Sequence, residues 1–198
     1  MKILFINACV RDNSRTLRLT KHLLKKLDGD VTELNLEKEN IQALNKDTLA
    51  YRDTCLHYGK FDDPMLSYAK QFSKADIIVI AAPFWDLSFP SVLKIYFENI
   101  IVSGVTFEYS EKGCPVGKCM AKKLYYITTS GGYIGNNNFG YDYVKALAEN
   151  FFGINDISFY SAEGLDIIGA DIEANKRCEE VGRKRWKEEV NYHKRSLV

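Results

Sequence analysis

The first residues whose types and spacing could do chemistry lie close to the N-terminus, directly after an apolar run. The segment NACVRDNSRTLRL places Arg11, Ser14, Arg15 and Thr16 within six positions, ahead of a helical pattern. A helix N-terminus presents unpaired N–H groups and a partial positive charge, which favour a bound phosphate. Hydroxyl and guanidinium groups add further donors. The segment is therefore typical of a phosphate-binding loop, although Ser14 is equally suited to be a plain helix N-cap.

Two known phosphate-binding patterns are absent from this segment, and their absence narrows the class of ligand that the loop is expected to bind. The segment contains no GxGxxG pattern, which would indicate a dinucleotide, and no GxxxxGK[ST] pattern, which would indicate a P-loop NTPase. A hydroxyl-rich loop without those glycines suits a single terminal phosphate monoester. We expect a mononucleotide rather than a dinucleotide in this loop.

Two later segments could enclose a flat ligand. The segment PFWD supplies an apolar wall from Pro83, Phe84 and Trp85, followed by the acid Asp86. The segment TTSGGYIGNNNFGY contains a glycine pair that lets the backbone approach a ligand closely. Both have simpler interpretations, since large aromatics often serve a core or an interface and Gly/Asn clusters often form plain turns. The glycines of the second segment are Gly131, Gly132, Gly135 and Gly140.

The elements that must position these three loops alternate along the chain. Short runs rich in Ile, Val, Phe and Tyr predict strands, and helical patterns separate them. Strict alternation predicts an α/β fold with a parallel sheet and helices on both faces, and ligands in such folds bind at the carboxyl ends of the strands. The strands are expected at 2–8, 31–36, 76–83, 123–130 and 156–164, and the helices at 17–27, 91–103, 144–151 and 171–195.

Composition sets outer limits on the class of protein. The 198 residues suit one domain, predicted over 1–198, with a long polar insertion at about 37–64 that could contain a helix over 41–51. A formal net charge of +1 gives no support for a nucleic-acid or membrane partner, and no stretch has the length of a membrane span. Five scattered cysteines and no signal-like N-terminus favour the cytoplasm. Their spacing does not indicate a metal site.

The segment around the aromatic loop resembles a known family. In the flavodoxin-like NAD(P)H quinone reductases and FMN-dependent NADH-azoreductases, a Pro-aromatic-aromatic strand end is followed by P-x-x-L-K, an acidic or amide residue and G-x-x-F-x-Y. This sequence has the same pieces in the same order, with the phosphate loop before them and the Ser-Gly-Gly loop after them. The matching residues are 83–85, 90–94, 98–99 and 104–109.

The resemblance implies a flavodoxin-like fold with a five-stranded parallel sheet and FMN as the bound cofactor. It implies that the phosphate loop, with Arg11, Ser14 and Thr16 and with Arg15 beside them, holds the FMN phosphate. It also implies that the aromatic loop lines the flavin, through Pro83, Phe84, Trp85 and Asp86. The glycine loop would face the polar edge of the ring, through Thr129, Ser130, Gly131 and Gly132. The N–H groups of Gly131 and Gly132 would then stabilise the reduced cofactor, as an oxyanion hole would.

The resemblance also implies an activity and a partner. NADH or NADPH would donate electrons, and a small-molecule acceptor such as a quinone or an azo compound would take them in a ping-pong sequence without a covalent protein nucleophile. Tyr133 and His57 are weak candidates for proton transfer. An ionised Asp86 beside the flavin would oppose its reduction. A homodimer with the flavin at its interface is expected. The alternatives are a flavodoxin-like FMN electron carrier without nicotinamide oxidase activity and a binding module without a cofactor.

Overall fold

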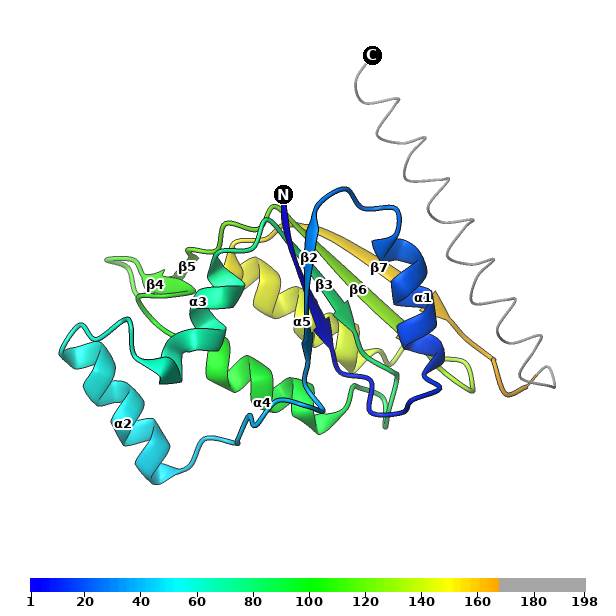
Figure 1. Cartoon of the computed structure of the whole chain (residues 1–198), viewed down its shortest axis with the longest axis horizontal. Helices are drawn as coiled ribbons and strands as arrows, with labels where there is room; N and C mark the ends of the chain where they lie inside the picture. Colours follow the sequence, from blue (N-terminus) through cyan, green and yellow to red (C-terminus); the bar gives the residue numbers. More distant parts are fainter. Residues whose placement is uncertain (168–198) are drawn as a thin grey trace, which may run out of the picture.

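A five-stranded parallel sheet forms the centre of the computed structural model, which describes residues 1–167 (Figure 1). The strand order is β2-β1-β3-β6-β7, and each strand is predominantly apolar where it is buried. This confirms the predicted flavodoxin-like sheet, and every strand overlaps its predicted range. The bounds are β1 Lys2–Asn7, β2 Asp30–Asn35, β3 Ile77–Ala81, β6 Lys123–Thr129 and β7 Asp156–Ala162.

Helices cover both faces of the sheet, because alternate residues of the central strands are apolar on each side. Ile78 and Ile80 of β3 pack in the core beneath α3 (Ser67–Ser73), α4 (Ser91–Ile100) and α5 (Phe139–Leu147). Ile77 and Val79 point to the opposite face, where they pack in the core beneath α1 (Arg15–Leu24). The double-sided burial explains why these strands read as continuous apolar runs.

The predicted helices agree in position, with differences at their ends. Helix α1 stops at Leu24 rather than continuing to Leu27. Helix α5 begins at Phe139, and its last turn widens into the π-helix η2 (Ala148–Phe152), which ends at Gly153 with a φ of 70°. Glycine is the residue that enters this left-handed conformation most readily, so the predicted helix end is confirmed. The predicted helix over 171–195 lies outside the described residues.

The prediction for the insertion was partly wrong. Helix α2 spans Lys46–His57 instead of 41–51, because Asn45 caps its first turn and accepts hydrogen bonds from the N–H groups of Asp47 and Thr48. Ile41, which was expected inside this helix, instead precedes the helix in the sequence and is buried against the main core. A short 3-10 turn, η1 (Pro64–Leu66), then leads into α3, and neither element was predicted.

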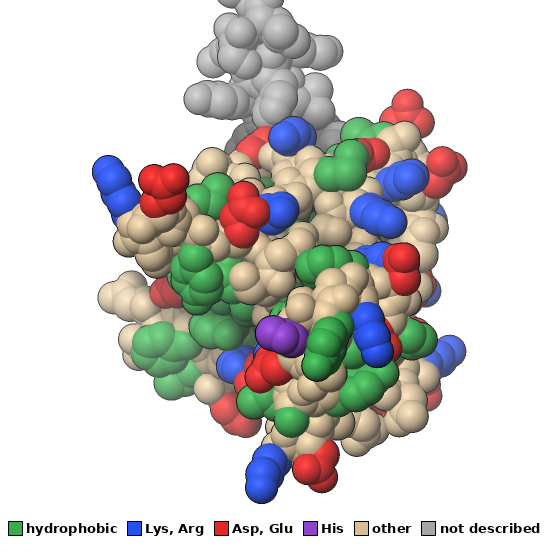
Figure 2. All heavy atoms as spheres, turned by 90° about the vertical axis from the view of Figure 1, so that its left-hand side faces the viewer, with side chains coloured by type: hydrophobic (Ala, Val, Ile, Leu, Met, Phe, Trp, Pro, Cys, Tyr) green, Lys and Arg blue, Asp and Glu red, His purple; other side chains and the backbone are tan. Residues whose placement is uncertain are grey.

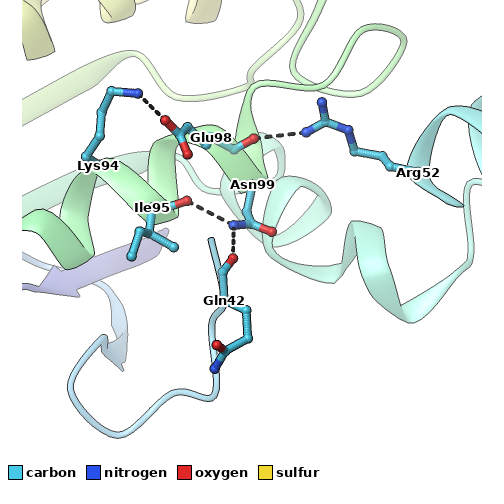
Figure 3. Close-up of polar contacts among 6 residues, drawn as sticks. All are labelled: Gln42, Arg52, Lys94, Ile95, Glu98 and Asn99. Carbon is cyan, nitrogen blue, oxygen red and sulfur yellow. Dashed lines mark hydrogen bonds and ion pairs between the residues drawn. The ribbon is translucent and has the colours of Figure 1, made fainter. Parts of the chain in front are cut away.

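Polar contacts attach the insertion to α4 (Figure 3). The Arg52 guanidinium donates to the carbonyl oxygen of Glu98 at 3.0 Å, and the Asn99 side-chain amide donates to the carbonyl oxygen of Gln42 at 3.0 Å. Glu98 lies in the last turn of α4, where carbonyl groups lack helical partners and a cation is favoured. In Figure 1, α2 consequently lies beyond α3 and α4 and makes no layer on the sheet itself.

A second, two-stranded sheet was not predicted. Strands β4 (Phe107–Tyr109) and β5 (Pro115–Gly117) form an antiparallel hairpin after α4, and β4 contains the aromatic residues of the G-x-x-F-x-Y motif. Each strand has three residues, which is too short to show an alternating pattern. Phe107 packs edge-on against Phe151 at a centroid distance of 5.1 Å, and this contact fixes the hairpin to η2.

The sheet order places the site. Strand β1 pairs with β2 on one side and with β3 on the other, so the connections after β1 and β3 lead to opposite faces of the sheet. A crevice opens at such a reversal of strand order, outside the carboxyl ends of the strands. None of the helices within 1–167 is both long and apolar enough to cross a membrane. A single domain over 1–198 stays a prediction.

Candidate functional site

A cavity of about 230 Å³ opens at the carboxyl edge of the sheet, between the loops that follow β1, β3 and β6. All of the predicted cofactor-binding residues line it except Asp86 and Gly132. Val10, Asn13 and Asp166 also line it and were not predicted. The sheet therefore brings together three loops that are separated by up to 120 residues of sequence. The predicted residues that line it are Arg11, Ser14, Arg15, Thr16, Pro83, Phe84, Trp85, Thr129, Ser130 and Gly131.

The first loop turns into α1 at Ser14. The Ser14 hydroxyl accepts a hydrogen bond from the N–H of Leu17 at 3.2 Å, so Ser14 is the N-cap that the simpler interpretation required. The same residue lines the cavity. Arg15 and Thr16 are the first residues of the helix, where N–H groups have no intrahelical partner. The end of α1 at the cavity is thus suited to an anion.

The two arginines of this loop lie differently. The Arg15 guanidinium donates to the Asp166 carboxylate at 2.7 Å, and its side chain is 21% exposed. Arg11 is exposed, and its guanidinium carbon lies 6.0 Å from the centre of the Trp85 ring, within the range of a cation–π contact. Two positively charged side chains, Arg11 and Arg15, therefore line the cavity in different surroundings.

The second loop makes a tight turn. The backbone N–H and C=O groups of Trp85 and Ser88 exchange two hydrogen bonds of 3.0 and 2.7 Å, and the residues between them, Asp86 and Leu87, have φ angles of 49° and 65°. Two successive positive φ values define the primed turn that favours Asn, Asp or Gly at the first position. Aspartate tolerates this conformation, whereas leucine does not. In this turn Trp85 lines the cavity, whereas Asp86 is exposed and does not line it.

Contacts with the third loop hold this turn in place. The N–H of Phe84 donates to the carbonyl oxygen of Thr129 at 3.1 Å, and the N–H of Phe139 donates to the carbonyl oxygen of Leu87 at 3.1 Å. At Gly140 an added methyl group would come within 3.2 Å of the Ser88 carbonyl carbon. The absence of a side chain at Gly140 therefore lets the start of α5 approach the aromatic turn.

The Thr16 and Thr129 hydroxyl groups join the first loop to the third. Their oxygen atoms are 2.7 Å apart, and both residues are buried. Next along the chain, the N–H of Ser130 donates to the carbonyl oxygen of Ala162 at the end of β7. Gly131 lines the cavity, whereas Gly132 is exposed with no atom near the position of a side chain. One buried hydrogen bond thus fixes the spacing of two walls of the cavity.

The weak candidates for proton transfer lie off the cavity. The side chain of Tyr133 is 70% exposed and packs over Gly164, and His57 is the last residue of α2, edge-on to Tyr58. Burial raises the pKa of the Cys9 thiol, which lies beneath the first loop, to about 11. That thiol stays protonated at neutral pH and is therefore a poor nucleophile. Across residues 1–167 no group of three or more His, Cys, Asp or Glu side chains could hold a metal ion.

The sheet order and the position of this cavity define a protein of the flavodoxin-like class, and comparison with known families agrees. The family model described as flavodoxin-like fold matches residues 1–188. Curated relatives named FMN-dependent NADH:quinone oxidoreductase are 39% identical over 87% of this chain and 90% of the relative in Coprothermobacter proteolyticus, and 38% identical over 87% and 91% in Lachnoclostridium phytofermentans. The chain belongs to this family of flavodoxin-like proteins, which confirms the resemblance seen in the sequence.

Solved structures of azoreductases share the fold of this chain. An FMN-dependent NADH-azoreductase from Bacillus anthracis str. Ames Ancestor, solved in complex with FMN, is 27% identical, with a TM-score of 0.75 over 94% of this chain and 98% of that one. A second azoreductase, from Bacillus anthracis str. Sterne, shares the fold with a TM-score of 0.78 at 24% identity, over 92% of this chain and 97% of that one.

We predict that the Thr16 and Thr129 hydroxyls stabilise the fold as a pair. Thr16→Val or Thr129→Val alone should lower the free energy of unfolding by about 1 to 3 kcal/mol, because each leaves a buried hydroxyl without its partner. The double variant should lose clearly less than the sum of the two, as measured by urea unfolding. Thr54→Val is the matched control, since its exposed hydroxyl bonds to the carbonyl of Ala50. Additive losses would contradict the pairing.

We also predict that Leu87 strains the aromatic turn. Leu87→Gly and Leu87→Ala remove the same half-exposed side chain, but only glycine adopts a positive φ freely. The glycine variant should be more stable than the alanine variant by about 1 kcal/mol. Thermal unfolding of the two variants side by side measures this difference. An alanine variant of equal or greater stability would show that the turn is not strained.

Proposed function

We propose that the cavity binds FMN and that the protein uses it to transfer electrons from NADH or NADPH to quinones, azo compounds or related electrophiles. The observation that supports this most directly is the meeting of three features in one cavity. These are the N-terminus of α1 with Arg15, the apolar wall that includes Trp85, and the glycine-containing loop at Gly131. A mononucleotide with a flat ring requires donors for its anionic phosphate, an apolar surface for its ring and backbone groups for the polar edge of that ring.

The residues present fit this cofactor. Arg11, Ser14, Arg15 and Thr16 would hold the phosphate through charge, hydroxyl and helix N–H groups. Pro83, Phe84 and Trp85 would line the ring, and the backbone of 129–132 would face its polar edge. FMN, when bound, supplies the hydride chemistry that no side chain of the cavity provides.

The protein's part is to bind, orient and exclude water. Its polar donors gather on the first and third loops, and its aromatic side chains gather on the second. This arrangement would hold the cofactor by two edges and leave one face for an incoming molecule. Because donor and acceptor would use that face in turn, we expect ping-pong kinetics.

The relatives narrow the choice of substrate. Their names specify NADH as the donor and a quinone as the acceptor, and the azoreductase in complex with FMN extends the acceptors to azo compounds. We therefore propose NADH as the first donor to test. A cytoplasmic location suits these substrates and the scattered cysteines of the chain.

We further propose a homodimer in which the insertion takes part. Exposed apolar side chains gather on the face of the molecule that bears α2 (Figure 2). Polar contacts attach the insertion to α4, so these side chains are left facing outward. A second copy would cover them. The exposed apolar residues of the insertion are Leu49, Tyr51, Tyr58 and Phe61.

The redox proposal predicts a yellow protein that NADH bleaches without oxygen and that a quinone recolours. The rates of bleaching and recolouring are measured by anaerobic stopped-flow absorbance of the FMN-loaded full chain at about 450 nm, with NADH and NADPH in separate runs. Rapid bleaching followed by recolouring is the expected result. FMN binding with very slow bleaching by both donors would favour the electron carrier, and a protein that takes up no FMN would overturn both flavin functions.

The dimer proposal predicts a particle of two chains whose contact includes α2. Tyr58→Asp puts a charge on a side chain that is 69% exposed, so it should weaken association at least tenfold without unfolding the chain. Light scattering coupled to gel filtration measures the mass across a dilution series. Met120→Asp, 56% exposed and close to the amino end of β6, is the control. Equal dimerisation of the two variants would exclude the α2 face.

A further inference from the structure

The turn that follows β7 forms a fourth wall of the cavity. The N–H groups of Gly164, Leu165 and Asp166 donate to the carbonyl oxygens of Gly132, Ser130 and Gly131 at 3.0, 3.2 and 3.0 Å. The turn therefore lies directly along the glycine loop, and its backbone fixes the path of that loop. Its last residue, Asp166, lines the cavity.

Glu163, at the start of the same turn, fixes the far end of the glycine loop. Its carboxylate accepts from the N–H of Ile134 at 3.0 Å and from the hydroxyl of Ser161 at 3.0 Å. Glu163 and Asp166 thus perform separate tasks, although only two residues lie between them.

Asp166 reaches across to the first loop. Its Oδ1 accepts from a terminal N–H group of Arg15 at 2.7 Å, and its carboxylate passes directly over Gly131. A side chain at Gly131 would overlap the Oδ2 atom of Asp166, so glycine is required there for the carboxylate to reach the arginine. The contact joins residues 151 positions apart.

The ion pair leaves Arg15 able to bind a second anion. A guanidinium has five N–H donors in a fixed plane, and a carboxylate that accepts from one end leaves the others free to donate. Both partners line the cavity, beside the N-terminus of α1. Arg11, by contrast, is exposed and lies against the Trp85 ring.

We propose that Asp166 is a positioning residue that holds the Arg15 guanidinium at the cavity wall, ready for the phosphate of FMN, and so makes the site selective for FMN over riboflavin. This inference rests on the proposed FMN function. Although the Asp166 side chain is 64% exposed, an arginine that already donates to a carboxylate loses less conformational freedom when it binds the phosphate than an unpaired one does. In this arrangement the Asp166 carboxylate pairs with the Arg15 guanidinium and is not directed at the ligand.

The test compares two flavins that differ by the phosphate. Apoprotein of the full chain is titrated with FMN and with riboflavin, and quenching of flavin fluorescence gives each Kd. Asp166→Ala should weaken FMN binding about tenfold, the cost of ordering one long side chain, and should change riboflavin binding less than about twofold. Asp166→Asn keeps an acceptor oxygen for Arg15 and should stay within about threefold of the wild type for FMN.

A double variant isolates the arginine. In an Arg15→Ala background, Asp166→Ala should cause no further loss of FMN affinity, because the group that it positions is absent. Glu108→Ala is the control, since it breaks a comparable ion pair with Lys118 on the β4–β5 hairpin, outside the cavity. Its Kd values for both flavins should equal those of the wild type.

Three results would overturn the inference. Tighter FMN binding by Asp166→Ala would show that the carboxylate opposes the phosphate. Equal losses of FMN and riboflavin affinity would show a general structural role of the turn. A loss of FMN affinity that is just as large in the Arg15→Ala background would show that Asp166 acts independently of Arg15. A wild-type protein that binds neither flavin would remove the proposed function as well. FMN binding with the expected selectivity but no reduction by NADH would remove the proposed function alone.

Discussion

The reversal of strand order at β1 is the constraint on which the other features of the site depend. β1 pairs with β2 and β3 at once, and the chain leaves β1 toward α1 and leaves β3 toward α4, on opposite faces. The two connections cannot close over the sheet edge, so a crevice remains between them. The N-terminus of α1 opens on one side of this crevice and the aromatic turn on the other.

A small number of contacts between loops then give the crevice its shape. Thr129, at the end of β6, takes part in two of them, since its hydroxyl pairs with Thr16 and its carbonyl accepts from the N–H of Phe84. One residue at the end of β6 therefore sets the distance from the glycine loop to both other loops. Buried polar pairs of this kind specify one arrangement more strongly than apolar contacts do, because an unpaired hydroxyl is costly.

The sequence was sufficient for the parts of the fold and site that depend on local pattern. The five strands are visible because burial on both faces makes them apolar throughout, and the three loops follow from the rule for parallel sheets. Helix α2 was misplaced because Ile41 and Asn45 have roles, as core residue and cap, that a helical pattern does not distinguish. Asp166 was missed for a different reason. Its partner Arg15 lies 151 residues away, and no local signal links them.

The acid in the aromatic loop shows how backbone geometry can account for a residue that side-chain chemistry leaves puzzling. Beside a flavin, an ionised Asp86 would oppose reduction, which makes the residue a poor choice for a cofactor wall. In the structure it occupies the first positive-φ position of a two-residue turn, where Asp is favoured for its conformation, and it is exposed and does not line the cavity. The turn reverses the chain directly after Trp85 and leaves that ring against the cavity. Asp86 thus serves the site through the turn it permits, and the position of its charge follows from the turn.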